Sequence, residues 1–411
     1  MTDIIPDLTE TAVQQRKYTR FVMFLLVFFA TKGSALSNSL LLPRILLVCL
    51  VIYFFKKKIS LDIPFVKLTA GYFLYAVVHM VASGVIGSLG NFLFFYIDVI
   101  LLTYLSIKYI GRDFFFLFER VVYKWTKIIL PIFFIQLLSP SLVFKVNSAI
   151  GTALKLSVGG REAYSNSILY TSNNAQHIAR NCGFMWEPGA FGAMLVIALI
   201  VYILREGLKM NKVVMIYLIS IITTLSTTAY INLMFIPVFI LTYNYTRKNK
   251  MLAVVLLAVC FVVFFLQSNN VVIDKITSQL ASIDNDTNQT IINTTGNSTI
   301  ALGRFSSLYY LLPLILQNFV IGIGWGAADG VSMTDSVNIS NGLALYFVMF
   351  GFIGFLFLLY NINKSFRHFT KLNWKTSLVF TLILLNIGFS NPILILPLFM
   401  AFQIYGYIKF I

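Results

Sequence analysis

Residues 184–204 read FMWEPGAFGAMLVIALIVYIL, and this stretch carries a single charged side chain, Glu187. A helix needs about 20 apolar residues to cross the hydrocarbon core of a bilayer, so the stretch has the length and composition of a membrane span. The rest of the chain is similar, because 58% of its 411 residues are hydrophobic and 11% are charged. Soluble domains carry roughly 25% charged residues. The sequence therefore predicts an all-α polytopic membrane protein.

Apolar runs of the same kind recur along the chain and predict twelve transmembrane helices. We place them at 20–37, 39–55, 63–84, 91–108, 121–139, 184–204, 213–229, 230–246, 251–267, 342–360, 376–390 and 392–409. A further apolar run, 304–323, is expected to be a helix on the outer surface, because crossing would put the acidic stretch 325–341 on the inside. Arg44 and Asp98 lie inside predicted spans, where a mutual ion pair is the simplest explanation for two charges.

The basic residues predict the orientation of the spans. Most of the 31 lysines and arginines lie in short segments on one side, as the positive-inside rule requires of cytoplasmic loops. The sequence thus predicts a bacterial inner-membrane protein with both termini in the cytoplasm. The net charge of +16 reflects this topology and gives no reason to expect nucleic-acid binding. The predicted parts are five N-terminal spans (1–139), a periplasmic loop (140–183), four central spans (184–267), a second periplasmic loop (268–341) and three C-terminal spans (342–411).

Charged residues at the outer ends of the spans are the first candidates for chemistry. Glu187 precedes Pro188 at a helix start, where it is either a capping residue or a general acid or base. Arg180 and Arg304 face the same side of the membrane. Each either contacts lipid headgroups or binds a phosphate group, since a guanidinium forks onto phosphate oxygens. The sequence therefore predicts an anion-binding site on the outer face.

Short polar motifs in the second loop are weaker candidates. Gly322, Gly324 and Gly326 permit either a plain tight turn or a close approach to a ligand. Two acidic residues follow, Asp329 and Asp335, and each is either a solvated loop residue or a candidate acid or base. Beyond them, Ser340-Asn341 predicts a helix cap, and Gly351-x-x-Gly354 predicts close helix packing. Asp284-Asn285-Asp286 has the form of a metal-binding motif, but we expect no metal ion there.

Taken in order, these motifs resemble the O-antigen polymerase family and the related O-antigen ligases. The motifs that carry the resemblance are Arg180-x-x-Gly183-x-x-x-Glu187-Pro188-x-x-Phe191-Gly192, Gly303-Arg304, Gly322-Ile323-Gly324-x-Gly326, and Asn341 with Gly351-x-x-Gly354. The resemblance implies a helical fold similar to the integral-membrane (GT-C-like) glycosyltransferases. It also implies a reaction, in which the growing glycan moves from undecaprenyl pyrophosphate to the non-reducing end of a lipid-linked repeat unit at the periplasmic face.

That reaction assigns roles to the candidates. Charge builds on the leaving pyrophosphate, so arginines are expected to bind it, and our candidates are Arg180, Arg304 and Arg161. An acid or base is expected at the acceptor hydroxyl, and our candidates are Glu187 and Asp335. Residues expected to belong to the substrate loops are His177, Gly322, Gly324 and Asn341. We expect no cofactor and no metal. The expected partners are the lipid-linked oligosaccharide, membrane lipid and a chain-length regulator protein, with no nucleic acid.

Two alternatives remain. O-antigen ligases commonly carry a histidine before the asparagine of the last motif, whereas this chain has Ser340, which favours the polymerase. A lipid-linked oligosaccharide flippase would also have many spans and basic inner loops. Transporters are usually built from two similar halves, and the sequence shows no such internal symmetry.

Overall fold

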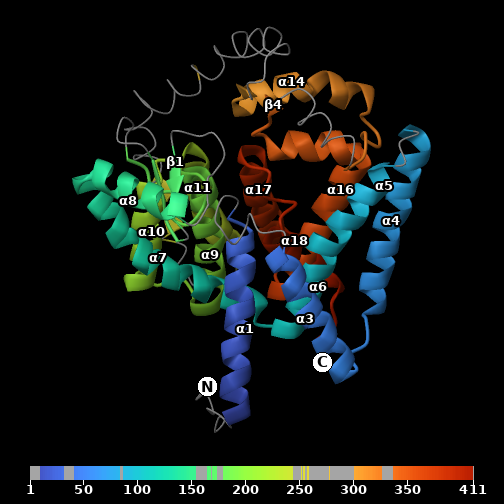
Figure 1. Ribbon diagram of the computed structural model, residues 1–411, viewed down its shortest axis with the longest axis horizontal. Helices are drawn as coiled ribbons and strands as arrows, with labels where there is room; N and C mark the ends of the chain where they lie inside the picture. Colours follow the sequence, from blue (N-terminus) through green and yellow to red (C-terminus); the bar gives the residue numbers. More distant parts are fainter. Residues whose placement is uncertain are drawn as a thin grey trace.

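The computed structural model describes residues 10–31, 41–83, 87–153, 164–167, 169–173, 179–243, 300–325 and 337–410, with isolated residues between 251 and 277. Most of these residues form a bundle of helices, and α14 lies across one end of it (Figure 1). The start of α1 and the turn after α18 lie toward the opposite end.

The helices in the first half of the chain are α1 (Glu10–Phe29), α3 (Leu41–Lys57), α4 (Ile63–Ser83), α5 (Gly87–Phe95), the π-helical η1 (Tyr96–Leu101), α6 (Leu102–Ile110), α7 (Phe114–Leu138), α8 (Pro140–Ala153) and α9 (Pro188–Glu206). Those in the second half are α10 (Lys212–Thr223), α11 (Thr227–Thr242), α14 (Arg304–Gln317), α16 (Gly342–Thr370), α17 (Trp374–Ser390), α18 (Pro397–Ile404) and the 3-10 turn η3 (Tyr405–Tyr407). Two small sheets complete the described part: β1 (Tyr164–Asn166) pairs antiparallel with β2 (Thr171–Asn173), and β3 (Ile300–Ala301) pairs parallel with β4 (Val337–Asn338).

Five described helical segments are long and apolar enough to cross a membrane: Ile63–Val81, Gly90–Ile110, Phe114–Leu138, Pro188–Glu206 and Gly342–Thr370. All five overlap predicted spans, so an all-α membrane protein is confirmed. The predicted number of twelve spans is not confirmed. Shorter apolar helices of 12, 16 and 17 residues occupy three further predicted positions. The predicted span 251–267 lies largely outside the described residues.

Some predicted boundaries are wrong. The span predicted at 213–229 ends as α10 at Thr223, because Thr224 and Leu225 form a turn before α11 begins. The span predicted at 392–409 contains a turn, the eight residues of α18 and the 3-10 turn η3. The surface helix predicted at 304–323 begins at Arg304 as expected but ends at Gln317.

Helix α9 is the centre of one half of the bundle. All its residues from Pro188 to Ile203 are buried, because α7, α10, α11 and α17 pack around it. Small residues permit this packing. A Cβ added at Gly192 would lie 2.5 Å from the Cβ of Ala229, so α9 and α11 approach each other closely at this glycine.

Helix α16 is interrupted at Gly351, whose φ of 60° and ψ of −166° are not helical. The sequence predicted helix packing at this glycine, and the structure instead shows a break. The loop after α14 satisfies the freed backbone groups. Ile323 and Gly324 donate N–H groups to the carbonyls of Val348 and Met349, at 2.8 and 3.0 Å.

The pairing continues on the other side of the break. Phe352 and Ile353 donate N–H groups to the carbonyls of Phe319 and Val320, at 2.7 and 3.1 Å. The hydroxyl of Tyr75 in α4 donates to the carbonyl of Ile321 at 2.7 Å. Because unsatisfied backbone groups are costly away from water, this pairing permits a broken helix within the bundle. A Cβ at Gly351 would lie 2.5 Å from the backbone nitrogen of Gly322, so the approach requires glycine.

Arg44 and Asp98 form the ion pair that their positions predicted. Arg44 in α3 donates from Nη2 to Oδ2 of Asp98 at 3.0 Å, and from Nε to Oδ1 at 3.3 Å. Asp98 lies in η1, the π-helical stretch between α5 and α6. The extra residue in a π-helical turn changes the direction of the side chains around it. The fork-to-fork geometry fixes α3 against η1.

We expect single charge reversals at this pair to lower the amount of protein in the membrane several-fold, because each places two like charges side by side at membrane depth. The variants are Arg44→Asp and Asp98→Arg. The double variant with both changes should restore the amount, since it re-forms the pair in reverse. Immunoblots of membrane fractions measure this. Equal loss in the single and double variants would show that the two residues do not stabilise the protein as a pair.

Candidate active site

The site begins at the buried N-terminus of α9. Glu187 precedes this helix in an extended conformation, and Pro188 is its first residue. Proline suits this position because the first N–H groups of a helix have no partner within it. The Glu187 side chain makes no capping hydrogen bond, and its Oε1 is buried without a hydrogen-bond partner. The carboxylate is therefore held at a helix start without being used to cap it.

Three polar groups surround Gly189. A Cβ at this glycine would lie 3.2 Å from Nη2 of Arg304, 3.4 Å from Nδ2 of Asn391 and 3.4 Å from Oε1 of Glu187. Nδ2 of Asn391 is also buried without a hydrogen-bond partner. Leaving a buried polar group unpaired costs about 1–3 kcal/mol, so a folded protein rarely keeps two at one point without a use for them. We call Glu187, Gly189, Arg304 and Asn391 the Gly189 cluster.

Arg304 enters this cluster from α14, where it is the first residue. Its Nη1 donates to Oγ1 of Thr228 in α11 at 3.1 Å, and that hydroxyl in turn hydrogen-bonds to Ser390 at the end of α17. Among the described residues no ion pair joins Arg304 to Glu187. One edge of the guanidinium is thus fixed in the protein, and Nη2 faces Gly189.

Arg180 lies beside the cluster on the segment that precedes α9. Its Nε and Nη2 donate to the carbonyls of Thr224 and Leu225, at 3.2 and 2.9 Å, where α10 ends. Leu225 has a positive φ of 46°, which is unfavourable for a residue with a side chain, so these hydrogen bonds support the turn. Asn181 adds two more hydrogen bonds to Thr223, both at 3.0 Å. The segment before α9 is therefore attached to the turn between α10 and α11.

Electrostatics connects the two arginines. Burial lowers the pKa of Arg304 below its usual value, the positive charge of Arg180 lowers it further, and the negative charge of Glu187 raises it. The net direction is downward, so the single carboxylate does not compensate for burial and a second cation. An anion bound between the arginines would relieve this repulsion.

Four helices start around the cluster. They are α9 at Pro188, α11 at Thr227, α14 at Arg304 and α16 at Gly342. The amide of Asn341 donates to the carbonyl of Arg304 at 3.2 Å, and a Cβ at Gly342 would lie 2.4 Å from the carbonyl oxygen of Asn391. Helix N-termini carry partial positive charge, so this convergence favours an anion such as phosphate.

Some predicted site residues lie elsewhere or act differently. Asn341 caps α16 by accepting from the N–H of Ala344 at 3.0 Å, which is the structural role that its position predicted. Gly322 and Gly324 lie in the loop that fills the break in α16. That loop follows the far end of α14, roughly 20 Å from Arg304 at 1.5 Å per helical residue. The structure therefore does not bring these two glycines to the cluster.

Other predicted residues lie outside the described residues. They are Arg161, His177, Asp284, Asp286, Gly326, Asp329 and Asp335. Within the described part, no group of three or more histidine, cysteine, aspartate or glutamate residues is placed to hold a metal ion.

Three residues at the site were not predicted from the sequence. Thr228, Ser390 and Asn391 lie in or next to apolar helices and belong to no charged motif. Asn391 precedes Pro392, and an Asn-Pro dipeptide is typical of a turn. The turn places the amide beside Gly189, and this proximity depends on tertiary packing alone.

Comparison with known proteins supports one family. Residues 212–359 match the model of the family described as O-Antigen ligase (Wzy_C). The match includes Thr228, Arg304, Asn341 and the break in α16, but not Arg180 or Glu187. No curated protein and no solved structure matches the chain. The resemblance predicted from the motifs is therefore confirmed over residues 212–359, which are similar to the O-antigen ligase family.

Proposed function

We propose that this protein is an O-antigen polymerase that uses a glycan carried on undecaprenyl pyrophosphate. The observation that supports it is the Gly189 cluster, in which a fixed arginine and an unpaired carboxylate meet where four helices start. Positive groups for a pyrophosphate and an acceptor for a proton are the two requirements of the transfer. The match to the O-antigen ligase family over residues 212–359 supports the substrate class.

The donor half of the reaction uses the arginines. The bond between the anomeric carbon of the donor sugar and the pyrophosphate oxygen breaks, and negative charge moves onto the leaving pyrophosphate. Nη2 of Arg304 faces Gly189, and Thr228 holds the other edge of the same guanidinium. A hydrogen-bond donor whose position is fixed before the reaction stabilises the developing negative charge without a cost of reorientation. Arg180 supplies the second positive charge from the turn after α10.

The acceptor half uses Glu187. The acceptor hydroxyl attacks the anomeric carbon, and its proton passes to Oε1 of Glu187. This oxygen has no competing hydrogen bond, although it lies at a helix start where a carboxylate commonly caps. The amide of Asn391 lies on the same side of Gly189 and can orient a sugar hydroxyl.

An O-antigen ligase is the second candidate, because the matched family carries that description. A ligase would use the same donor but would transfer the glycan to a lipid core. The position that carries histidine in ligases is Ser340, whose hydroxyl donates to the carbonyl of Leu302 at 2.9 Å. Its N–H donates to Oγ of Ser307 at 3.1 Å. Ser340 therefore connects β4 to the start of α14, and it has no group that titrates near neutral pH.

A lipopolysaccharide gel from a strain that lacks the gene tests the proposal. A core band carrying a single repeat unit, with no ladder above it, is expected, because export and ligation continue while polymerisation stops. Core without any repeat unit would contradict the polymerase and would indicate the ligase or a flippase.

We expect Glu187→Gln to reduce the rate of polymer formation by about 10²–10⁴, the range typical for loss of a general base, with an unchanged amount of protein. Glutamine keeps the size of the side chain but does not accept the proton. Ladder formation in a complemented strain, quantified against an immunoblot, measures this. The matched control is Glu206→Gln, at the exposed far end of the same helix. An unchanged ladder with Glu187→Gln would remove this residue from the catalytic role.

We expect Gly189→Ala to abolish most of the ladder while the protein still folds. The new methyl group would lie within 3.4 Å of groups on Glu187, Arg304 and Asn391, and would occupy the space that the substrate needs. Alanine is otherwise favourable in a helix. The control is Gly71→Ala in α4, where an added Cβ meets nothing within 4 Å. Full activity with Gly189→Ala would show that substrate does not enter between these side chains.

A further inference from the structure

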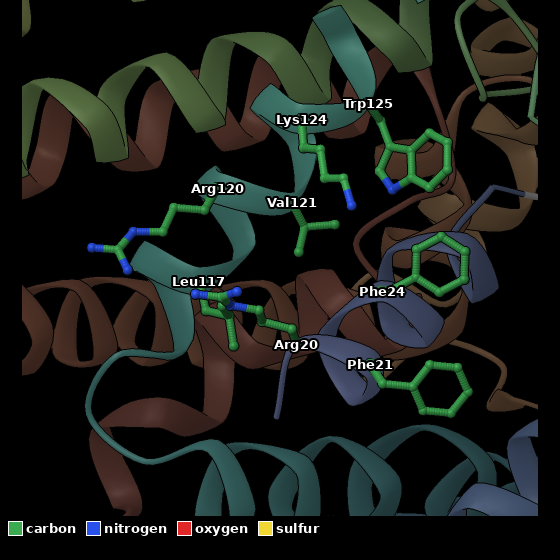
Figure 2. A pocket seen from close by; sticks show the side chains of 8 residues that line it. All are labelled: Arg20, Phe21, Phe24, Leu117, Arg120, Val121, Lys124 and Trp125. Atoms are coloured by element: carbon green, nitrogen blue, oxygen red, sulfur yellow. The ribbon is translucent and has the colours of Figure 1, made fainter. Parts of the chain in front are cut away.

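A cavity of about 380 Å³ lies between α1 and α7, away from the Gly189 cluster (Figure 2). Its charged lining comes from Arg20 on α1 and from Arg120 and Lys124 on α7, and none of the described residues that line it is acidic. Arg120 and Lys124 are four residues apart and therefore share one face of their helix. In Figure 2, Arg20 extends from α1 toward Leu117 of α7.

The three cations are not neutralised within the described part of the chain. None of them takes part in an ion pair there. The neighbouring acid in the sequence, Glu119, is buried and pairs with Arg205 at 2.6 Å, and it also accepts from the hydroxyl of Tyr217. Its charge is thus already engaged on the other side of α7. Three positive charges that form no ion pair among the described residues surround one cavity, and they favour an anionic ligand there.

Aromatic side chains form the other wall of the cavity. The rings of Phe24 and Trp125 lie 5.5 Å apart, and Phe21 stacks on Phe24 at 6.5 Å. Phe21 is 56% exposed, so it presents an apolar surface next to the cations. Aromatic residues beside basic ones are typical of the level where lipid headgroups meet acyl chains. The cavity therefore fits a molecule with an anionic head and an apolar tail.

We propose that this cavity binds an anionic phospholipid, with the headgroup phosphate between Arg20, Arg120 and Lys124. Its acyl chains would lie along Phe21 and Phe24. Basic pockets between transmembrane helices on the cytoplasmic side bind anionic headgroups in other membrane proteins. The pocket lies about midway along α1 and in the first half of α7. Figure 1 shows the start of α1 toward the end of the bundle opposite α14. The bound lipid would join α1 to α7, and through α7 to the central helix α9.

The test uses the full chain purified in detergent. Its melting temperature is measured with added phosphatidylglycerol, with phosphatidylcholine and with inorganic phosphate at constant ionic strength. We expect phosphatidylglycerol to raise the melting temperature by several degrees, because a ligand that binds the folded state stabilises it. Phosphatidylcholine should have little effect since it carries no net charge, and phosphate should have little effect since it lacks the acyl chains.

Variants distinguish lipid binding in the cavity from a general attraction of anionic lipid to basic surfaces. Arg120→Gln/Lys124→Gln should lose the rise, whereas Lys56→Gln/Lys57→Gln should keep it. Lys56 and Lys57 are exposed at the end of α3, and replacing both removes the same amount of positive charge as the cavity variant. Arg20→Gln, a single exposed change, should reduce the rise if the double variant folds poorly. An equal rise with phosphatidylcholine, an equal rise with phosphate, or an unchanged rise in Arg120→Gln/Lys124→Gln would each overturn the proposal.

Discussion

The start of α9 is fixed because four helices enclose it, and the arrangement of the site depends on this constraint. The first N–H groups of a helix have no hydrogen-bond partner within it, and at a buried helix start few water molecules are present to accept from them. Pro188 removes one such group, and the segment before it is attached to the turn after α10 through Arg180 and Asn181. Glu187 is therefore positioned by its backbone alone, and its carboxylate remains available to groups from other helices.

Arg304 reaches the same point because α14 is held at both ends by α16. At its first residue, the side chain of Asn341 donates to the carbonyl of Arg304. At its far end, the loop 318–324 pairs with the backbone on both sides of Gly351. The break in α16 therefore also positions α14, because the backbone groups that it frees bind the loop at the end of that helix. A continuous α16 would have no backbone groups to hold that loop.

Prediction from sequence succeeded where a physical rule acts locally. Apolar runs of about 20 residues identified the long spans, and the isolated charges of Arg44 and Asp98 indicated their pairing. Prediction was less accurate where tertiary packing determines the end of a helix or the residues that meet at the site. The end of α10 at Thr223 lies at the start of the hydroxyl-rich stretch TTLSTT (223–228), and the predicted boundary was six residues too late. Glu187 and Arg304 were identified by charge, whereas Thr228, Ser390 and Asn391 became visible only when the helices were assembled.

The short α10 has a consequence for the surrounding bilayer. Its 12 residues rise about 18 Å, whereas the hydrocarbon core of a membrane is about 30 Å thick. Met215, Ile219 and Ile222 form an exposed apolar stripe along it, so this helix faces lipid. A hydrophobic segment shorter than the bilayer draws the leaflet toward itself. The turn held by Arg180 would then lie where the bilayer is locally thinner. A polar headgroup could reach a greater depth there and still remain in contact with water.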